Sequence, residues 1–98
     1  MENKDIASAK RTIDKEVEAL HMMEGELDDT LSKALDVMQN AKGRVIITGM
    51  GKSGHIGSKI AATLASTGTP SFFVHPGEAS HGDLGMLTTD DVVVAISN

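Results

Sequence analysis

The first forty residues carry apolar side chains at helical spacing. Between positions 5 and 24 they recur every three or four residues, at Ile6, Ala9, Ile13, Val17 and Leu20. Most charged side chains fall on the opposite face, so this spacing predicts an amphipathic helix. Gly25 is expected to interrupt it. Packing is the favoured role of the helix, although a long amphipathic helix could equally serve a subunit interface.

A second helix is predicted to run to about Asn40. Its apolar side recurs at Leu27, Leu31, Ala34, Leu35 and Met38. The segment 28–30 (DDT) offers side-chain oxygens that cap a helix N-terminus. Gly43 is expected just past the end of this helix, where glycine commonly terminates helices.

From residue 44 the pattern changes to short apolar runs separated by helical spacing. The β-branched run 45–48 ends at Gly49 and predicts a strand buried on both faces. A helix is predicted over 53–66, in which Gly57, Ala61 and Ala65 would let it lie close to a sheet. Further strands are predicted over 71–74 and 92–96, the last of them buried, with a loop containing a helical turn between them. Strands alternating with helices predict a parallel sheet with right-handed crossovers and an α/β fold.

Two parts of the chain are therefore expected. Residues 1–43 form an N-terminal helical segment, and residues 44–98 form the first part of a ligand-binding α/β domain. A domain rarely stops directly after a buried strand, because the neighbouring strand and its covering helix would be missing. We therefore expect the sequence to be part of something longer.

The amino-acid composition limits which kinds of partner the protein is expected to bind and where in the cell it is expected to be. The net charge of -5 disfavours nucleic acid or an anionic membrane as a generic partner. The absence of cysteine excludes disulfides and thiolate metal sites. No apolar run approaches the length of a membrane span, and the polar, acidic start is unlike a signal peptide. A cytoplasmic location is expected.

A glycine-rich turn, 49–54 (GMGKSG), lies between the first strand and the following helix. Glycines there bring bare backbone N–H groups close to a ligand, and the helix start adds a partial positive charge. Lys52 contributes a full charge and Ser53 a hydroxyl. The turn therefore predicts a site for a phosphate or a phosphorylated small molecule, in preference to a tight turn without a ligand.

The kind of phosphate ligand is less sharply defined by this turn. Its spacing matches the dinucleotide fingerprint G-x-G-x-x-G, which alone is a weak signal. That fingerprint needs an acidic residue at the end of the second strand, but His75 follows Val74 and Glu78 comes too late. Dinucleotide binding stays as an alternative. The nucleotide P-loop is excluded, because Ile46 stands where its first glycine is required.

The loop 75–85 (HPGEASHGDLG) follows the second strand. Loops at the carboxyl ends of parallel strands converge on the ligand crevice, so His75 and His81 should share its rim with Lys52. Histidine and carboxylate side chains suit proton transfer, while Lys52 could stabilise a developing oxyanion. Hydrogen-bonded loop histidines are the alternative. A structural zinc site is not favoured, because the histidine spacing matches no common zinc pattern and no third ligand is evident.

Three segments together resemble one family: 49–57 (GMGKSGHIG), 65–70 (ASTGTP) and 75–85. They are similar to the arabinose 5-phosphate isomerases of the sugar-isomerase (SIS) domain superfamily, over about residues 6–98. The resemblance implies a three-layer α/β/α sandwich with a parallel sheet in flavodoxin-like order, of which about three strands are present here. It also implies interconversion of D-arabinose 5-phosphate and D-ribulose 5-phosphate, at the entry to 3-deoxy-D-manno-octulosonate and lipopolysaccharide synthesis. Paired CBS domains and a homotetramer are usual in the family.

The resemblance also implies roles for individual residues. Lys52 and His81 are the catalytic candidates, and Ser53 matches the phosphate-binding serine. The implied substrate contacts are Gly68, Thr69, His75, His81 and Ser97. His75 also matches a position associated with bound, inhibitory zinc, while no cofactor is expected to be required. The family's later glutamates and histidine are absent before Asn98, so the 98-residue chain is expected to be inactive alone.

Two other classes of function stay open at the level of sequence. A regulatory phosphosugar-binding SIS module would need only the serine and glycine contacts, and Lys52 together with the segment 81–85 favours the enzyme over it. A dinucleotide-binding oxidoreductase would respond to NADH and not to a pentose 5-phosphate, so titration with both ligands separates these interpretations.

Overall fold

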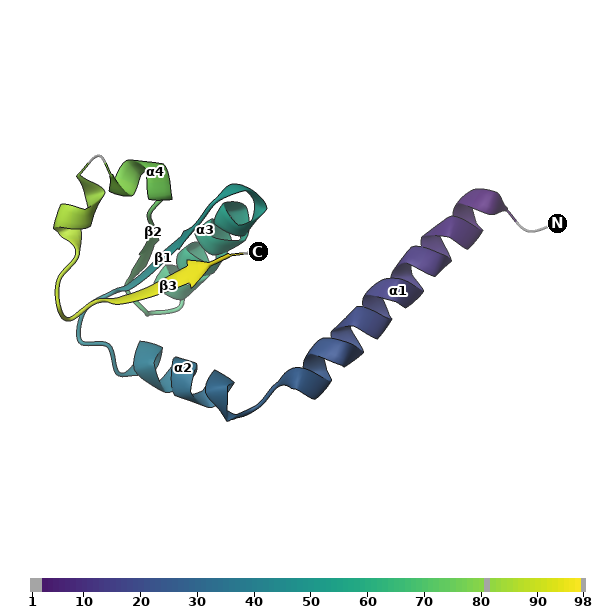
Figure 1. Cartoon of the computed structure of the whole chain (residues 1–98), viewed down its shortest axis with the longest axis horizontal. Coiled ribbons are helices and arrows are strands. Elements are labelled where there is room, and N and C mark those ends of the chain that lie inside the picture. Colours follow the sequence, from purple (N-terminus) through teal and green to yellow (C-terminus); the bar gives the residue numbers. More distant parts are fainter. Residues whose placement is uncertain (1–2, 81, 98) are drawn as a thin grey trace. The chain divides into compact units, whose positions relative to one another are not determined.

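The computed structural model describes residues 3–80 and 82–97 (Figure 1). The chain divides into two compact units, Met1–Ala34 and Leu35–Asn98. Each unit is described by itself.

The first unit contains helix α1, Lys4–Glu26. Its first turn is capped by Asn3, whose Oδ1 accepts hydrogen bonds from the backbone N–H groups of Asp5 at 2.8 Å and Ile6 at 3.3 Å. The predicted interruption at Gly25 is wrong. The helix continues through this residue and the chain leaves it at Leu27, which is extended.

Helix α2, Asp29–Gln39, begins at the predicted capping segment. The carboxylate of Asp28 accepts a hydrogen bond from the backbone N–H of Thr30 at 2.9 Å and another from its hydroxyl, which confirms the capping prediction. These bonds also lower the pKa of Asp28, the hydroxyl bond most. The predicted end near Asn40 is confirmed, because the helix stops at Gln39, but Gly43 lies further along the chain and does not cap the helix.

Gly43 instead allows a close approach to another part of the chain. Its N–H donates to the carbonyl of Asp90 at 2.8 Å. A Cβ atom at this position would collide with the side chain of Asp91. The glycine is therefore required by a contact between segments far apart in the sequence.

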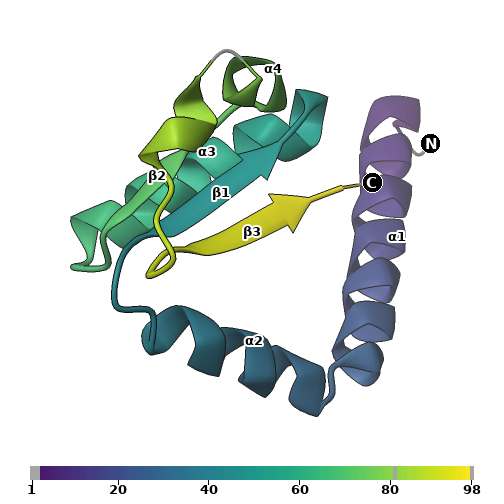
Figure 2. The same cartoon turned by 60° about the vertical axis from the view of Figure 1, so that its left-hand side comes forward.

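Within the described residues, a parallel sheet of three strands forms the centre of the second unit (Figure 2). Its strands are β1, Val45–Gly49; β2, Ser71–Phe73; and β3, Val92–Ile96. Their order is β2-β1-β3, with Val45 opposite both Ser71 and Val92. Helix α3, Gly51–Ser66, connects β1 to β2, while α4, Pro76–Ala79, and a 3-10 turn, Asp83–Met86, lead towards β3. The predicted parallel α/β arrangement is confirmed.

The central strand provides most of the core. Val45, Ile46 and Ile47 are 1–2% exposed, as expected for a parallel strand covered on both faces. Strand β3 differs from the prediction, because its residues alternate between partly buried and exposed and Val93 is 52% exposed. It forms one edge of the sheet within the part of the chain described.

Helix α3 packs on the sheet through its smallest residues. Gly54, Gly57 and Ala61 are buried, and a Cβ atom on Gly57 would lie 3.0 Å from Cγ2 of Ile47. The prediction for Gly57 and Ala61 is confirmed, whereas Ala65 is exposed and Gly54 takes its place. The small side chains bring the helix backbone close to β1.

An ion pair fixes the start of β3 beside β1. The Asp91 carboxylate accepts hydrogen bonds from the backbone N–H groups of Arg44 at 2.7 Å and Thr88 at 2.8 Å. The Arg44 guanidinium lies 3.3 Å from the same carboxylate and 4.7 Å from the centre of the Phe72 ring. These contacts hold the start of β3 beside the start of β1. They therefore set the register, in which the two strands also end level with each other.

Candidate functional site

The candidate site lies where β1 and β3 end and α3 begins. A hollow of 420 Å³ opens there, lined by Thr48, Gly49, Met50, Ser53, Pro76, Ala95, Ile96 and Ser97. Two of the predicted substrate contacts, Ser53 and Ser97, therefore line the same hollow. In parallel sheets the carboxyl ends of the strands are the usual place for a ligand.

Close backbone packing shapes this hollow. A Cβ atom on Gly49 would lie 3.0 Å from the carbonyl oxygen of Ile96, and one on Gly54 would lie 2.7 Å from the carbonyl oxygen of Gly49. Gly51 has a φ of 58°, a conformation that favours glycine. The three glycines thus serve the sharp turn and the tight contact between β1 and α3.

The first turn of α3 provides the donors for an anion. The leading N–H groups of an α-helix have no partner within the helix and carry a partial positive charge. Gly51, Lys52 and Ser53 occupy this position, while the N–H of Gly54 bonds to the carbonyl of Met50 at 3.3 Å. Together with the Ser53 hydroxyl, this arrangement can bind a phosphate group.

Lys52 is the second residue of α3 and its side chain is exposed to solvent. It stands between the positive-φ glycine and Ser53. Its ammonium group can add a full positive charge beside the helix N-terminus.

His75 follows β2 and caps the short helix α4. Its Nδ1 accepts a hydrogen bond from the backbone N–H of Gly77 at 3.0 Å. In the neutral imidazole the proton then resides on Nε2, which is left as a donor. His75 lines a separate hollow of 310 Å³, together with Gly51, Gly54, His55, Ser58 and Phe73. It therefore flanks the start of α3.

The second predicted histidine, His81, lies outside the described residues. Within 3–80 and 82–97, no group of three or more potential metal ligands comes together. Zinc bound to His75 at Nε2 would move the proton to Nδ1 and break the hydrogen bond from Gly77. Zinc at His75 would therefore come at the expense of the α4 cap.

Gly68 and Thr69 lie at the opposite end of α3. Gly68 has a φ of 102°, and the N–H of Thr69 donates to the carbonyl of Leu64 at 2.9 Å. The chain enters β2 directly after them, so they lie beside the amino ends of the strands. The part of α3 that separates them from Ser53 ends at Ser66 and is about 20 Å long at 1.5 Å per residue. The structure does not bring these two predicted contacts to the hollow at Ser53.

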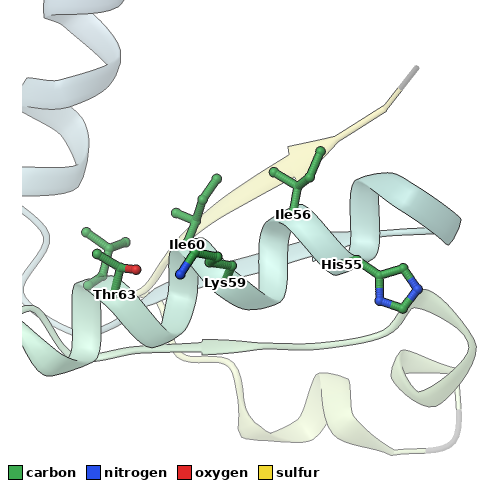
Figure 3. Close-up of a pocket in the computed structure, with 6 residues that line it drawn as sticks. His55, Ile56, Lys59, Ile60 and Thr63 are labelled. Carbon is green, nitrogen blue, oxygen red and sulfur yellow. The ribbon is translucent and has the colours of Figure 1, made fainter. Parts of the chain in front are cut away.

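A larger hollow of 540 Å³ runs along the outer face of α3 (Figure 3). It is lined by His55, Ile56, Lys59, Ile60, Thr63 and Leu64. Ile56 and Ile60 project from the same side of the helix and are 57% and 40% exposed. This surface is mainly aliphatic, although His55, Lys59 and Thr63 also line it, and it includes neither Ser53 nor Ser97.

Sequence patterns missed part of the site. Ala95, Ile96 and Pro76 line the main hollow, and His55 lines the neighbouring one together with His75. The end of β3 was recognisable from its apolar run. Which strand lies next to β1 is decided by topology, and no local motif carries that information.

A family comparison agrees with this arrangement. The SIS domain family matches residues 38–98, and the chain belongs to this family. No helix within the described part of the chain is long and apolar enough to cross a membrane.

Individual relatives are more specific. The chain is 61% identical over 93 residues to a Pseudomonas aeruginosa protein named arabinose 5-phosphate isomerase KdsD, and 56% identical over 91 residues to the Escherichia coli K12 protein of that name. These alignments cover 95% and 93% of this chain but 28% of each relative. The chain therefore spans less than a third of the length of the relatives it matches.

Solved structures share the fold. The structure of E. coli CFT073 c3406 in complex with arabinose 5-phosphate superposes with a TM-score of 0.89 at 47% identity, covering 100% of this chain and 53% of that one. A phosphosugar isomerase described as putative and as involved in capsule formation in Bacteroides fragilis gives a TM-score of 0.86 at 40% identity. That match covers 95% of this chain and 50% of the other.

Proposed function

We propose that this chain supplies the phosphate-binding part of an aldose–ketose isomerase that interconverts D-arabinose 5-phosphate and D-ribulose 5-phosphate. The observation that carries the proposal is the hollow where Ser53, Ser97 and the start of α3 meet. The identity to proteins named arabinose 5-phosphate isomerase supports the choice of sugar.

In this proposal the phosphate binds to the first N–H groups of α3 and to the Ser53 hydroxyl. A base removes the proton from C2 of the aldose, and the electron pair of that C–H bond forms the enediolate. Reprotonation at C1 then gives the ketose. Lys52 stabilises the negative oxygen of the enediolate. A preorganised positive charge lowers the barrier to the step in which this oxygen becomes charged.

The two histidines take part in handling protons on the sugar oxygens. The Nε2–H of His75 is available as a donor, because its Nδ1 accepts from Gly77. His81 is proposed as the second catalytic group and substrate contact. Zinc bound at His75 would inhibit, since it occupies Nε2, and the reaction as proposed requires no cofactor.

We still propose that Gly68 and Thr69 contact the substrate, but their position at the far end of α3 limits where this contact can occur. They lie beyond the end of α3, which is about 20 Å along the helix from Ser53, so they can serve a sugar only at a site assembled with another subunit. A homotetramer, as the family resemblance implies, would allow this. We further propose a cytoplasmic enzyme in 3-deoxy-D-manno-octulosonate and lipopolysaccharide synthesis.

An isomerase assay on the complete protein that contains these residues tests the proposal. Lys52→Met should reduce kcat by about 100-fold or more, the scale for loss of an oxyanion-stabilising group. Lys59→Met is the matched control, because Lys59 is an exposed lysine two turns further along α3. Equal activity of the two variants, or thermal stabilisation by NADH and not by D-arabinose 5-phosphate, would contradict the proposal.

A further inference from the structure

The guanidinium of Arg44 makes a contact that the alignment of the strands does not require. The backbone of Arg44 already joins β1 to β3, because its N–H donates to the Asp91 carboxylate at 2.7 Å and its carbonyl accepts from the N–H of Val92 at 2.9 Å. The side chain adds a hydrogen bond from Nη2 to the carbonyl oxygen of Met86 at 2.6 Å. This bond holds the end of the 3-10 turn and not a strand.

Two further groups fix the position of this guanidinium. Its Nη2 lies 3.3 Å from the Asp91 carboxylate, and its central carbon lies 4.7 Å from the centre of the Phe72 ring. Arginine suits this place, because its planar group can stack on a ring while its N–H groups point to oxygen acceptors. Since Asp91 directly precedes β3 and Phe72 lies in β2, the 3-10 turn is tied to the sheet at two strands.

The 3-10 turn in turn lies against α4, the short helix that borders the candidate site. The two are in contact and lie side by side in Figure 1 and Figure 2. Helix α4 starts directly after His75, which caps it, and its first residue, Pro76, lines the main hollow. A chain of contacts therefore runs from Arg44 through the 3-10 turn and α4 to the imidazole of His75.

We propose that Arg44 is a positioning residue of the isomerase, which holds the 3-10 turn, and through it α4, where His75 can reach the bound sugar. The inference rests on the proposed function of the site. Arg44 precedes β1 and lies about 16 Å from Gly49 at the other end of this strand, for five residues at 3.3 Å each. It therefore acts on the proton-handling side of the site and not on the phosphate donors of α3.

Kinetics of the complete protein that contains these residues test the proposal. Arg44→Met keeps the aliphatic stem and removes the guanidinium. It should lower kcat for D-arabinose 5-phosphate by about 10- to 100-fold, the scale for a displaced catalytic group. KM and the affinity for inorganic phosphate should stay close to the parent values, because the first turn of α3 and Ser53 are unchanged.

Asp91→Asn is the matched control for lost stability. It removes the charge opposite the guanidinium but not the hydrogen bond to Met86, so it should destabilise the fold while kcat stays near the parent value. Guanidinium chloride, added below the concentration that unfolds the protein, should restore part of kcat in Arg44→Met and leave kcat of Asp91→Asn unchanged. A purely structural role of Arg44 predicts no such rescue.

Arg44→Lys replaces Arg44→Met if the latter does not fold, because its ammonium group keeps the charge beside Asp91 but lacks the planar group over Phe72. The same loss of kcat at unchanged phosphate affinity is expected. A folded Arg44 variant with the parent kcat, equal losses of kcat and phosphate affinity, or no rescue of Arg44→Met would overturn the inference. A parent protein that binds phosphate but does not isomerise D-arabinose 5-phosphate would instead contradict the proposed function.

Discussion

At the scale of single residues, Asp91 has the most strongly shifted pKa in the described part of the second unit. Its carboxylate is 2% exposed and faces the Arg44 guanidinium. The backbone N–H of Arg44, that of Thr88 and then the guanidinium lower the pKa of Asp91 from 3.8 to about 2. The group therefore stabilises the fold in its ionised form, at the point where β3 is aligned with β1.

Replacing Asp91 by asparagine should remove one component of acid sensitivity. Because the folded pKa lies below the ordinary value of 3.8, the stabilisation is complete above that pH and is lost as the pH falls towards about 2. Urea midpoints measured across this range should fall for the parent and fall less for Asp91→Asn. Asp90→Asn is the control, since the hydrogen bonds described use the carboxylate of Asp91. Parallel curves for parent and Asp91→Asn would contradict this account.

His75 combines a structural and a chemical role that two variants can separate. Asparagine is a good N-cap, so His75→Asn should keep the stability of α4, whereas His75→Ala should lose up to about 1 kcal/mol. Both variants lack the Nε2–H donor and should bind D-arabinose 5-phosphate more weakly. Chemical unfolding and ligand titration of both proteins distinguish the roles. Full affinity in His75→Asn would show that the imidazole does not contact the sugar.

At the scale of elements, the contact of α3 with β1 positions the candidate site. A Cβ atom on Gly54 would lie 2.7 Å from the carbonyl oxygen of Gly49, which is backbone and cannot rotate away. Gly54→Ala should therefore displace the start of α3, destabilise the fold by about 1–3 kcal/mol and weaken sugar-phosphate binding at least about tenfold.

Gly25→Ala provides the contrasting case. Apart from its own helix backbone and chain neighbours, none of the described atoms lies within 4 Å of a Cβ built there, and α1 continues through this residue. Alanine should stabilise α1 by up to about 1 kcal/mol, because it loses less backbone entropy on forming a helix. Circular dichroism and binding measurements on both variants would check this. Equal effects of the two substitutions would refute the importance of the close contact at Gly54.

The spacing of apolar residues predicted most of the helices and strands. It failed where a contact between residues far apart in the sequence determines the local structure. The faces of α1 and α3 and the buried β1 follow from periodicity. Gly43 was misread because its role depends on Asp90 and Asp91, almost fifty residues later. The run of valines in β3 reads as buried, but its exposure depends on its place at an edge of the described sheet.

At the scale of the whole molecule, the site was predicted in part. Ser53 and Ser97 were expected near one ligand and line one hollow. Gly68 and Thr69 were expected with them but lie at the other end of α3. A motif states which residues belong together in a family, whereas the fold of one chain decides which of them meet without a second subunit.

The central claim is that a phosphate docks on the first turn of α3 beside Ser53. Amide NMR of the protein titrated with D-arabinose 5-phosphate tests it most directly. The account predicts that the largest and saturable shifts occur at Gly51, Lys52, Ser53 and Ser97, and that they weaken in Ser53→Ala. Shifts concentrated on the outer face of α3, around Ile56 and Ile60, with residues 51–53 unchanged, would contradict it.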